Sequence, residues 1–198
     1  MILPYQNKYP KIDESVLIAE GAHIIGDVEI GKDSSIWFNT VIRGDVNYIR
    51  VGERTNIQDL TMVHVTWKKF PTFIGNDISI GHSAVIHGCK IDDFVLIGIG
   101  TKLLDNCHVN SYSLVAAGSV VREGFEVPEG TLVAGVPAKI IRELKPEEIE
   151  KIKQNAKNYQ FYCVCNLLVI SFKFDCCWIV FVVIHEKYLK YLFFYTTI

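Results

Sequence analysis

Aliphatic residues recur at every sixth position through most of the chain, and this period constrains the fold more than any other feature. It matches neither the 3.6-residue period of an α-helix nor the two-residue alternation of an isolated strand. In a parallel β-helix, six residues form one short face, and three such faces complete a triangular coil. We therefore predict an all-β, left-handed parallel β-helix with the aliphatic residues inside. The recurring positions are Ile18, Ile24, Ile30, Ile36, Ile42, Val51, Ile57, Val63, Ile74, Ile80, Ile86, Ile91, Ile97, Leu103, Val109 and Val115.

The six-residue series is adjusted at three places. We interpret Tyr48-Ile49-Arg50 and five residues of the Trp67–Phe73 stretch as insertions that bulge out of the coil, and one position is dropped before Ile91. With these adjustments the series keeps its phase over roughly fifteen repeats, which a chance run of valine and isoleucine would not do. We expect the β-helix to occupy residues 1–144.

Residues 145–160 predict a C-terminal α-helix that packs on the β-helix. Pro146 suits the first turn, and Glu147 and Glu148 lie near the positive end of the helix dipole. An apolar stripe at helical spacing gives the helix a face for packing. The stripe consists of Ile149, Ile152, Ala156 and Tyr159.

Residues 161–198 are strongly apolar, yet they contain no Gly, Pro or Ala. A membrane span needs about 20 mostly apolar residues. The segment 161–184 is long enough, but Lys173 and Asp175 interrupt it, and charges are costly at that depth. We therefore expect a non-native extension, such as run-on translation after a frameshift. A membrane anchor and an ordered packing element are the alternatives.

Charge and cysteine usage bound the partners and the compartment. The formal net charge is −2, so the chain lacks the basic field that attracts nucleic acid. Its first residues lack the basic and apolar regions of a secretory signal peptide. We expect a cytoplasmic protein with reduced thiols and no nucleic-acid partner. The six cysteines are Cys89 and Cys107 in the repeats, and Cys163, Cys165, Cys176 and Cys177 beyond them.

The repeat also predicts which side chains lie together. The residue that follows the apolar position of each hexad points out of the coil. Counting three hexads per coil places Arg43, His64 and His87 in one outward column. Neighbouring strands lie about 4.8 Å apart, so two imidazoles in one column can share a metal ion with N–metal bonds of about 2.0–2.1 Å.

His82 belongs to a different face of the coil, and Asp59 lies in its column. Within one chain His82 cannot easily reach His64 and His87. A cyclic trimer removes this difficulty, because one face of a subunit can meet a different face of its neighbour and the ring then closes. We predict a metal site with His64 and His87 from one chain and His82 from the next. Three neutral imidazoles and a water form the open arrangement of catalytic zinc, with Fe²⁺ or Co²⁺ as alternatives.

Several spaced motifs carry a resemblance to a known family. They are IRGD at 42–45, NIQD at 56–59, the single His64, IGH-x4-H at 80–87 and GVPAK at 135–139. Together they resemble the γ-class carbonic anhydrase family of hexapeptide-repeat proteins, over about residues 1–160. The resemblance implies a homotrimeric enzyme that hydrates CO₂ reversibly to bicarbonate with a metal-bound hydroxide. It also implies zinc on His64, on His87 and on His82 of the neighbouring chain.

The resemblance further implies roles for four other residues. Arg43 and Asp45 would help to hold the subunit interface, and Asp59 would pair with Arg43 across it. Gln58 would orient the metal-bound water or bicarbonate. The alternative for Arg43, Asp45 and Asp59 is a purely structural ion-pair network.

The chain departs from the family pattern in its acidic residues. Founding members carry an acidic loop and a proton-shuttling glutamate, whereas here Val46 follows Asp45 and the loop TWKKFPTF has no carboxylate. General acid–base help is typically worth about 10²–10⁴-fold, so we expect the site to be present and the rate to be poor. Tyr159 is a candidate for the tyrosine that the terminal helix of relatives places near the site.

Other activities fit the same residues. A metal site could hydrolyse a thioester such as acyl-coenzyme A, with the loop of Trp67, Lys68, Lys69 and Phe70 receiving a phosphate-bearing ligand. A solvated surface loop is the alternative for these four residues. A hexapeptide-repeat acyltransferase could use a histidine as general base without metal, and it would share GVPAK. A structural trimer without catalysis is the remaining alternative.

Overall fold

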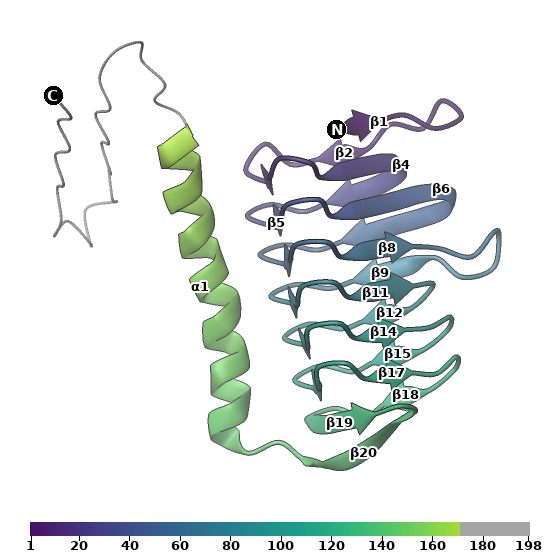
Figure 1. Ribbon diagram of the computed structural model, residues 1–198, viewed down its shortest axis with the longest axis vertical. Helices are drawn as coiled ribbons and strands as arrows, with labels where there is room; N and C mark the ends of the chain where they lie inside the picture. The colour runs from purple at the N-terminus through teal and green to yellow at the C-terminus, as the bar shows by residue number, and fades with distance from the viewer. Residues whose placement is uncertain (171–198) are drawn as a thin grey trace, which may run out of the picture.

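The computed structural model describes the backbone of residues 1–170 and the side chains of residues 1–159. The repeats form a parallel β-helix, and along one side of it lies the one α-helix that residues 1–170 contain (Figure 1). The predicted fold class is therefore confirmed.

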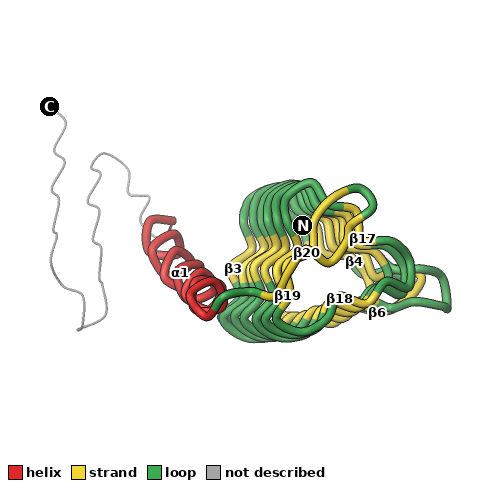
Figure 2. The backbone as a smooth tube through the Cα atoms, turned by 90° about the horizontal axis from the view of Figure 1, so that it is seen from below, coloured by secondary structure: helices red, strands yellow, loops and turns green. Residues whose placement is uncertain are grey.

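Each coil of the β-helix contributes a short strand to each of three faces, which surround the interior when the molecule is viewed end-on (Figure 2). The long strands β4 (His23–Ile30) and β6 (Val41–Val51) turn the corner from the first face to the second. The first face is completed by β1 (Ile2–Leu3), β8 (Met62–His64), β11 (Val85–His87), β14 (Lys102–Leu103) and β17 (Val120–Val121). The second face is completed by β2 (Lys11–Ile12), β9 (Thr72–Ile74), β12 (Lys90–Ile91), β15 (His108–Val109) and β18 (Glu126–Val127). The third face consists of β3 (Leu17–Ile18), β5 (Ser35–Ile36), β7 (Asn56–Ile57), β10 (Ser79–Ile80), β13 (Leu96–Ile97), β16 (Leu114–Val115), β19 (Thr131–Gly135) and β20 (Ala138–Glu143).

The recurring aliphatic residues form the core. Apart from Ile18, which is partly exposed, every predicted inward position is at most 5% exposed. Burying one such side chain is worth about 1.5–3 kcal/mol, so a loss of phase would be costly in every coil. The inward period therefore fixes the stacking of the coils.

One corner of successive coils requires a left-handed backbone. In five successive coils, the third residue after the strand of the third face turns there with φ between 57° and 69°, whether or not it is glycine. This corner position is occupied by Asn39, Leu60, Ser83, Gly100 and Gly118.

The first insertion lies elsewhere than we predicted. Ile49 is completely buried and pairs with Val28, so it belongs to the coil. The extra residues lie earlier, where the segment from Asp45 to Tyr48 stands opposite Asp27 alone. We call residues 45–48 the bulge.

The second insertion lies where it was predicted, in the chain between β8 and β9. Thr66 pairs with Phe70 in an antiparallel bridge, which makes this segment a small hairpin. We call residues 65–71 the hairpin. The bulge and the hairpin project from the same corner of two successive coils, between the first and second faces.

The helix α1 (Pro146–Ile170) begins where expected but continues beyond residue 160, where we expected it to end. Its residues Ile152 and Ala156 are buried, and it packs on the third face against β5 and β10. Our expectations for residues 171–198 lie outside the described part of the chain. Within that part, no helix has the length and apolar character needed to span a bilayer. Cys89 and Cys107 are buried and unbridged.

Candidate metal centre

The strands β8 and β11 place His64 and His87 side by side. The preceding residues Val63 and Ile86 are completely buried, and side chains alternate along a strand, so both imidazoles point outward. The two histidines are register partners, and their ring centroids lie 5.1 Å apart. The predicted stacking of these two residues is confirmed.

The two rings face each other through one nitrogen each. His64 Nδ1 lies 3.1 Å from His87 Nε2. The other nitrogens contact carboxylates, His64 Nε2 at 3.0 Å from Asp45 Oδ1 and His87 Nδ1 at 2.6 Å from Asp105 Oδ1. A carboxylate only accepts hydrogen bonds, so the contacted nitrogens donate and the facing nitrogens keep their lone pairs in the neutral rings. Burial lowers the pKa of His64, more than its contact with Asp45 raises it, and this favours the neutral form.

This donor pair fits a divalent metal ion. The gap of 3.1 Å is shorter than two Zn–N bonds of about 2.0–2.1 Å each, so one ion can contact both nitrogens. Metal-binding histidines usually direct their second ring nitrogen to a carboxylate or carbonyl group. Imidazole nitrogens are ligands of zinc, Fe²⁺ and Co²⁺, so this donor pair fits any of the three ions.

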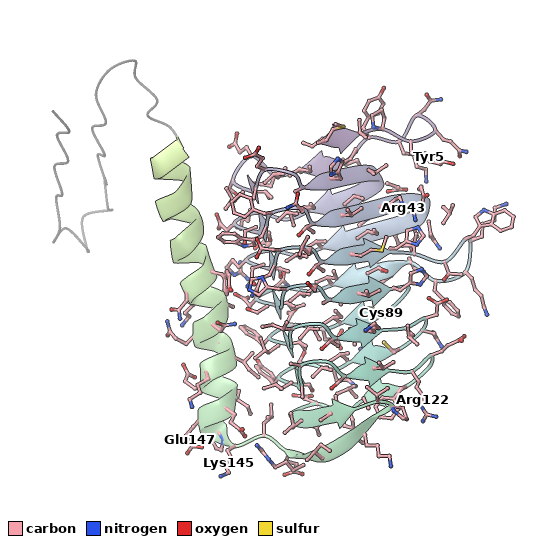
Figure 3. The ribbon with its side chains drawn as sticks, in the orientation of Figure 1. Tyr5, Arg43, Cys89, Arg122, Lys145 and Glu147 are labelled. Atoms are coloured by element: carbon pink, nitrogen blue, oxygen red, sulfur yellow. The ribbon has the colours of Figure 1, made fainter. Side chains whose placement is uncertain are left out.

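Arg43 lies in the same column as His64, on the side of the β-helix away from α1 (Figure 3). Its guanidinium forms an ion pair with Asp45 in the bulge. Burial raises the pKa of the Asp45 carboxyl, but contacts to His64 and Arg43 outweigh this and hold it below its ordinary value. Asp45 therefore links the arginine to the first histidine as an ionised acceptor.

His82 and Asp59 lie together at the end of the third face. His82 Nδ1 is 2.6 Å from Asp59 Oδ2, so the predicted shared column is confirmed. The exposed side chains of Phe38 and Ile99 occupy the equivalent positions in the coils on either side. Among the side chains of residues 1–159, no three metal-ligating groups gather at one point, and His82 stays apart from the other two histidines.

Gln58 is buried beside α1. Its amide nitrogen donates to Asn56 Oδ1 at 3.0 Å, and the Asn56 amide donates to Ser79 Oγ at 2.7 Å. The neighbouring coil presents Trp37, whose ring forms a T-shaped contact with the ring of Tyr159 at a centroid distance of 5.9 Å. Tyr159 therefore lies on the same part of the third face as Gln58, and Asn56 is a supporting residue that the sequence did not reveal.

Asp105 is the most important residue that sequence reasoning missed. Its second oxygen accepts a hydrogen bond from Thr66 Oγ1 at 2.5 Å, so one carboxylate joins His87 to the hairpin. Burial raises the pKa of Asp105, but contacts with Thr66 and His87 outweigh it and lower that pKa. The signal was available, because Asp105 follows Leu104, the residue that continues the column of His87.

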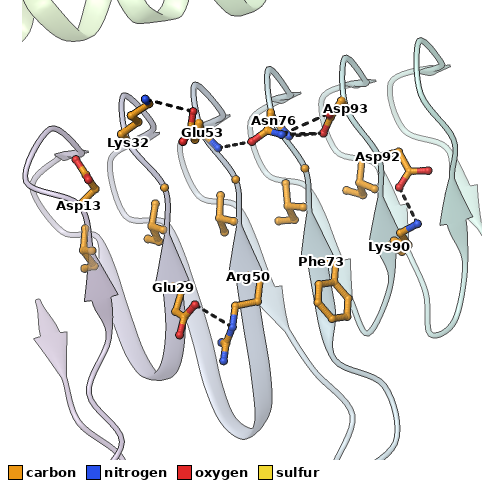
Figure 4. Close-up of a pocket in the computed structure, with 18 of the residues that line it drawn as sticks. Asp13, Glu29, Lys32, Arg50, Glu53, Phe73, Asn76, Lys90, Asp92 and Asp93 are labelled. Carbon is orange, nitrogen blue, oxygen red and sulfur yellow. Dashed lines mark hydrogen bonds and ion pairs between the residues drawn. The ribbon is translucent and has the colours of Figure 1, made fainter.

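A separate groove of about 980 Å³ runs along the corner between the second and third faces, over successive coils (Figure 4). Its charged side chains pair with one another, as Arg50 does with Glu29 at 3.3 Å and Lys90 with Asp92 at 2.9 Å. The three candidate histidines do not line it.

Comparisons with known proteins point to two related groups. A family model described as bacterial transferase hexapeptide (six repeats) matches residues 9–44. The chain is 50% identical over 158 residues to gamma carbonic anhydrase 2, mitochondrial, of Arabidopsis thaliana; this covers 77% of the chain but only 57% of the length of the plant protein. It is 48% identical over 148 residues to a Methanocaldococcus jannaschii protein named "Probable carbonic anhydrase", covering 75% of this chain and 92% of that one. A solved hexapeptide transferase family protein from Anaplasma phagocytophilum is 42% identical, with a TM-score of 0.79 over 82% of this chain and 95% of that chain.

Proposed function

Because this chain belongs to the γ-class carbonic anhydrase family, we propose that it is a metal-dependent carbonic anhydrase that works as a homotrimer. The proposed reaction is the reversible hydration of CO₂ to bicarbonate and a proton. One observation carries the proposal. Each of the three candidate ligands, His64, His82 and His87, has one ring nitrogen on an aspartate, which leaves its other nitrogen for a metal ion.

We propose that His64 and His87 of one subunit and His82 of the next hold the ion. Zinc suits three imidazoles best, and Fe²⁺ or Co²⁺ would also bind. When bound, such an ion lowers the pKa of a water ligand to about 7, a value typical of catalytic zinc in general, carbonic anhydrases included.

Exposed apolar side chains support the trimer, because they surround both halves of the proposed site. Phe38 and Ile99, 45% and 56% exposed, flank the pair formed by Asp59 and His82. On the first face, Met62 and Leu104 lie beside the other two histidines and are 39% and 37% exposed. Two different apolar surfaces on one chain suit a heterologous interface that closes into a ring.

The remaining candidate residues would position the reactants. The amide of Gln58 donates to Asn56, which leaves its carbonyl oxygen to accept a hydrogen bond from water or bicarbonate. Arg43 and Asp45 form one charged pair beside His64, and we propose that they stabilise the interface and the ring of His64. Asp59 contacts His82 within the chain, so we propose that it orients His82, whether or not it also meets Arg43 across the interface.

Among the steps of the proposed reaction, proton release has the least support from the described side chains, because none of the carboxylates near the histidines is free to take the proton. The hairpin contains no carboxylate, and Asp45 and Asp105 are both occupied by histidines. General acid–base help is worth about 10²–10⁴-fold. We therefore expect slow turnover that depends on the buffer as proton acceptor.

Mixing two inactive variants tests the shared site. His64→Ala and His82→Ala chains, co-expressed at equal amounts, should form mixed trimers with one intact site each. Random mixing in a closed ring should restore about a quarter of the wild-type CO₂ hydration rate. A matched control is His64→Ala with His87→Ala, which should restore nothing, because both ligands come from the same chain. Restoration in both mixtures, or in neither, would contradict the proposed arrangement.

The resemblance to a hexapeptide transferase family protein keeps acyl transfer as the competing function. Metal content and substrate range discriminate between them. A chain purified with one metal ion per subunit, active on CO₂ and inactive on acyl-coenzyme A, would support the carbonic anhydrase. Thioester hydrolysis that needs the metal would favour the hydrolase, and acyl transfer that survives a chelator would favour a metal-free transferase.

A further inference from the structure

The hairpin is built as an ordered unit beside the proposed metal centre. Thr66 N donates to Phe70 O at 2.9 Å, which closes the hairpin. Lys68 N donates to Val46 O at 3.3 Å, and the side-chain amide of Asn47 donates to Thr66 O at 3.1 Å. The hairpin and the bulge thus form one connected rim.

The rim contacts both histidines through carboxylates. Asp45 in the bulge contacts His64 at 3.0 Å. Asp105 contacts His87 at 2.6 Å with one oxygen and Thr66 of the hairpin at 2.5 Å with the other. Thr66 and Asp105 are 39 positions apart in the sequence, so the link spans two coils rather than a local turn.

Gly88 provides the space for this link. A Cβ at position 88 would lie 2.5 Å from Asp105 Oδ1 and 3.0 Å from the Cβ of Phe70. Both distances are shorter than ordinary van der Waals contact, and the distance to Asp105 is the shorter of the two. The carboxylate and the hairpin therefore pack directly on the bare α-carbon of the residue that follows His87.

We propose that Asp105 is a positioning residue that, through Thr66, couples the order of the hairpin to the orientation of His87. This inference rests on the proposed function, because it takes the metal ion to bind His87 Nε2. The Asp105 contact holds the His87 ring with that nitrogen toward His64. The same carboxylate also accepts the hydrogen bond from Thr66, so a change that fixes the position of Asp105 fixes both the His87 ring and the hairpin.

Thermodynamic linkage makes the coupling reciprocal. If an ordered hairpin raises the metal affinity, then metal binding must order the hairpin by the same factor. The rim could instead be a rigid surface that the metal does not affect. These two cases differ in what removal of the Thr66 hydroxyl does, because that hydroxyl contacts neither histidine ring in the described structure.

The experiment combines metal titration with hydrogen exchange of the full chain. Zn²⁺ and Co²⁺ are titrated into wild type, Thr66→Val, Thr66→Ser and Asp105→Ala, and amide exchange of residues 65–71 is followed by mass spectrometry. We expect Asp105→Ala to weaken metal affinity about 10–100-fold. We expect Thr66→Val to weaken metal affinity about fivefold or more, a typical coupling strength. Thr66→Ser keeps the hydroxyl and should bind metal as wild type does. Metal should slow exchange of the hairpin in wild type and not in Thr66→Val.

Asp92→Ala is the matched control. Asp92 contacts His108 at 2.7 Å, and the two aspartate side chains are similarly exposed, 27% for Asp92 and 24% for Asp105. This variant should leave metal affinity and hairpin exchange unchanged. Wild-type affinity and exchange in Thr66→Val would overturn the coupling while the metal site stands. If wild type binds neither metal, the proposed function and the coupling both fail.

Discussion

Replacing Gly88 by alanine should disturb the metal centre although residue 88 is not a ligand. The backbone there has φ +55°, and an alanine Cβ would stand 2.5 Å from Asp105 Oδ1. The carboxylate must then move away from His87 and Thr66. Gly118 offers the comparison, because it has φ +69° and nothing within 4 Å of an added Cβ.

Both substitutions cost the backbone strain of an L-residue at positive φ, but only Gly88→Ala also loses hydrogen bonds. An L-residue in the left-handed region costs about 1–2 kcal/mol at either position. Gly88→Ala additionally breaks two hydrogen bonds to a carboxylate. Such bonds are worth about 1.5–3 kcal/mol each when buried, and we take about 1–2 kcal/mol for the pair because Asp105 is 24% exposed. Gly88→Ala should therefore destabilise the chain by about 2–4 kcal/mol and Gly118→Ala by about 1–2 kcal/mol.

Urea unfolding of the metal-free protein measures this difference. Chelator is present throughout, and chain concentration is held constant because an oligomer's stability depends on it. A zinc titration at neutral pH then compares metal affinity, which should fall only in Gly88→Ala. Equal destabilisation by the two alanines, together with wild-type affinity in Gly88→Ala, would refute the steric argument.

Three further outcomes follow from the core and the site. Ile86→Ala should lower the free energy of unfolding by about 2–5 kcal/mol and Ile86→Val by about 0.5–1.5 kcal/mol, since this side chain is completely buried; similar losses would mean that the interior does not pack tightly there. The pKa of His64 is lowered, so the unfolded chain takes up a proton first as pH falls and metal-free stability should drop below about pH 6.5. That drop should be smaller in His64→Gln, and an unchanged pH profile would speak against a neutral His64. Turnover should rise with the concentration of imidazole buffer, and a rate independent of buffer would mean that a proton acceptor of the chain was overlooked.

Much of the fold could be predicted because the interior of a coil admits only apolar side chains. The position of the first insertion could not, since Ile49 and Val51 are both aliphatic and either could resume the series. Only the pairing of Ile49 with Val28 decides between them. The end of α1 was also mispredicted, because the apolar stripe of an amphipathic helix gives no clear stop signal before residue 161.

The candidate site likewise contains contacts that could be predicted from the sequence and one that could not. Counting hexads placed His64 beside His87 and Asp59 beside His82, because both are statements about neighbouring backbone positions. The count leads to Leu104, the residue before Asp105, but it does not show that Asp105 contacts His87. A register says which α-carbons are neighbours, but Asp105 reaches His87 diagonally, through space that exists only because the intervening residue is glycine.

The two insertions at one corner have a consequence for how such a protein can change. The chain returns to phase after each of them, at Ile49 and at Ile74, and the core passes beneath both without interruption. The interior of each coil packs only against the interiors of its neighbours, so segments of other length or charge could be grafted at this corner without repacking the interior. The scaffold and the chemistry at its rim can therefore evolve as separate modules, and loop exchange between homologues is a direct route to altering one while keeping the other.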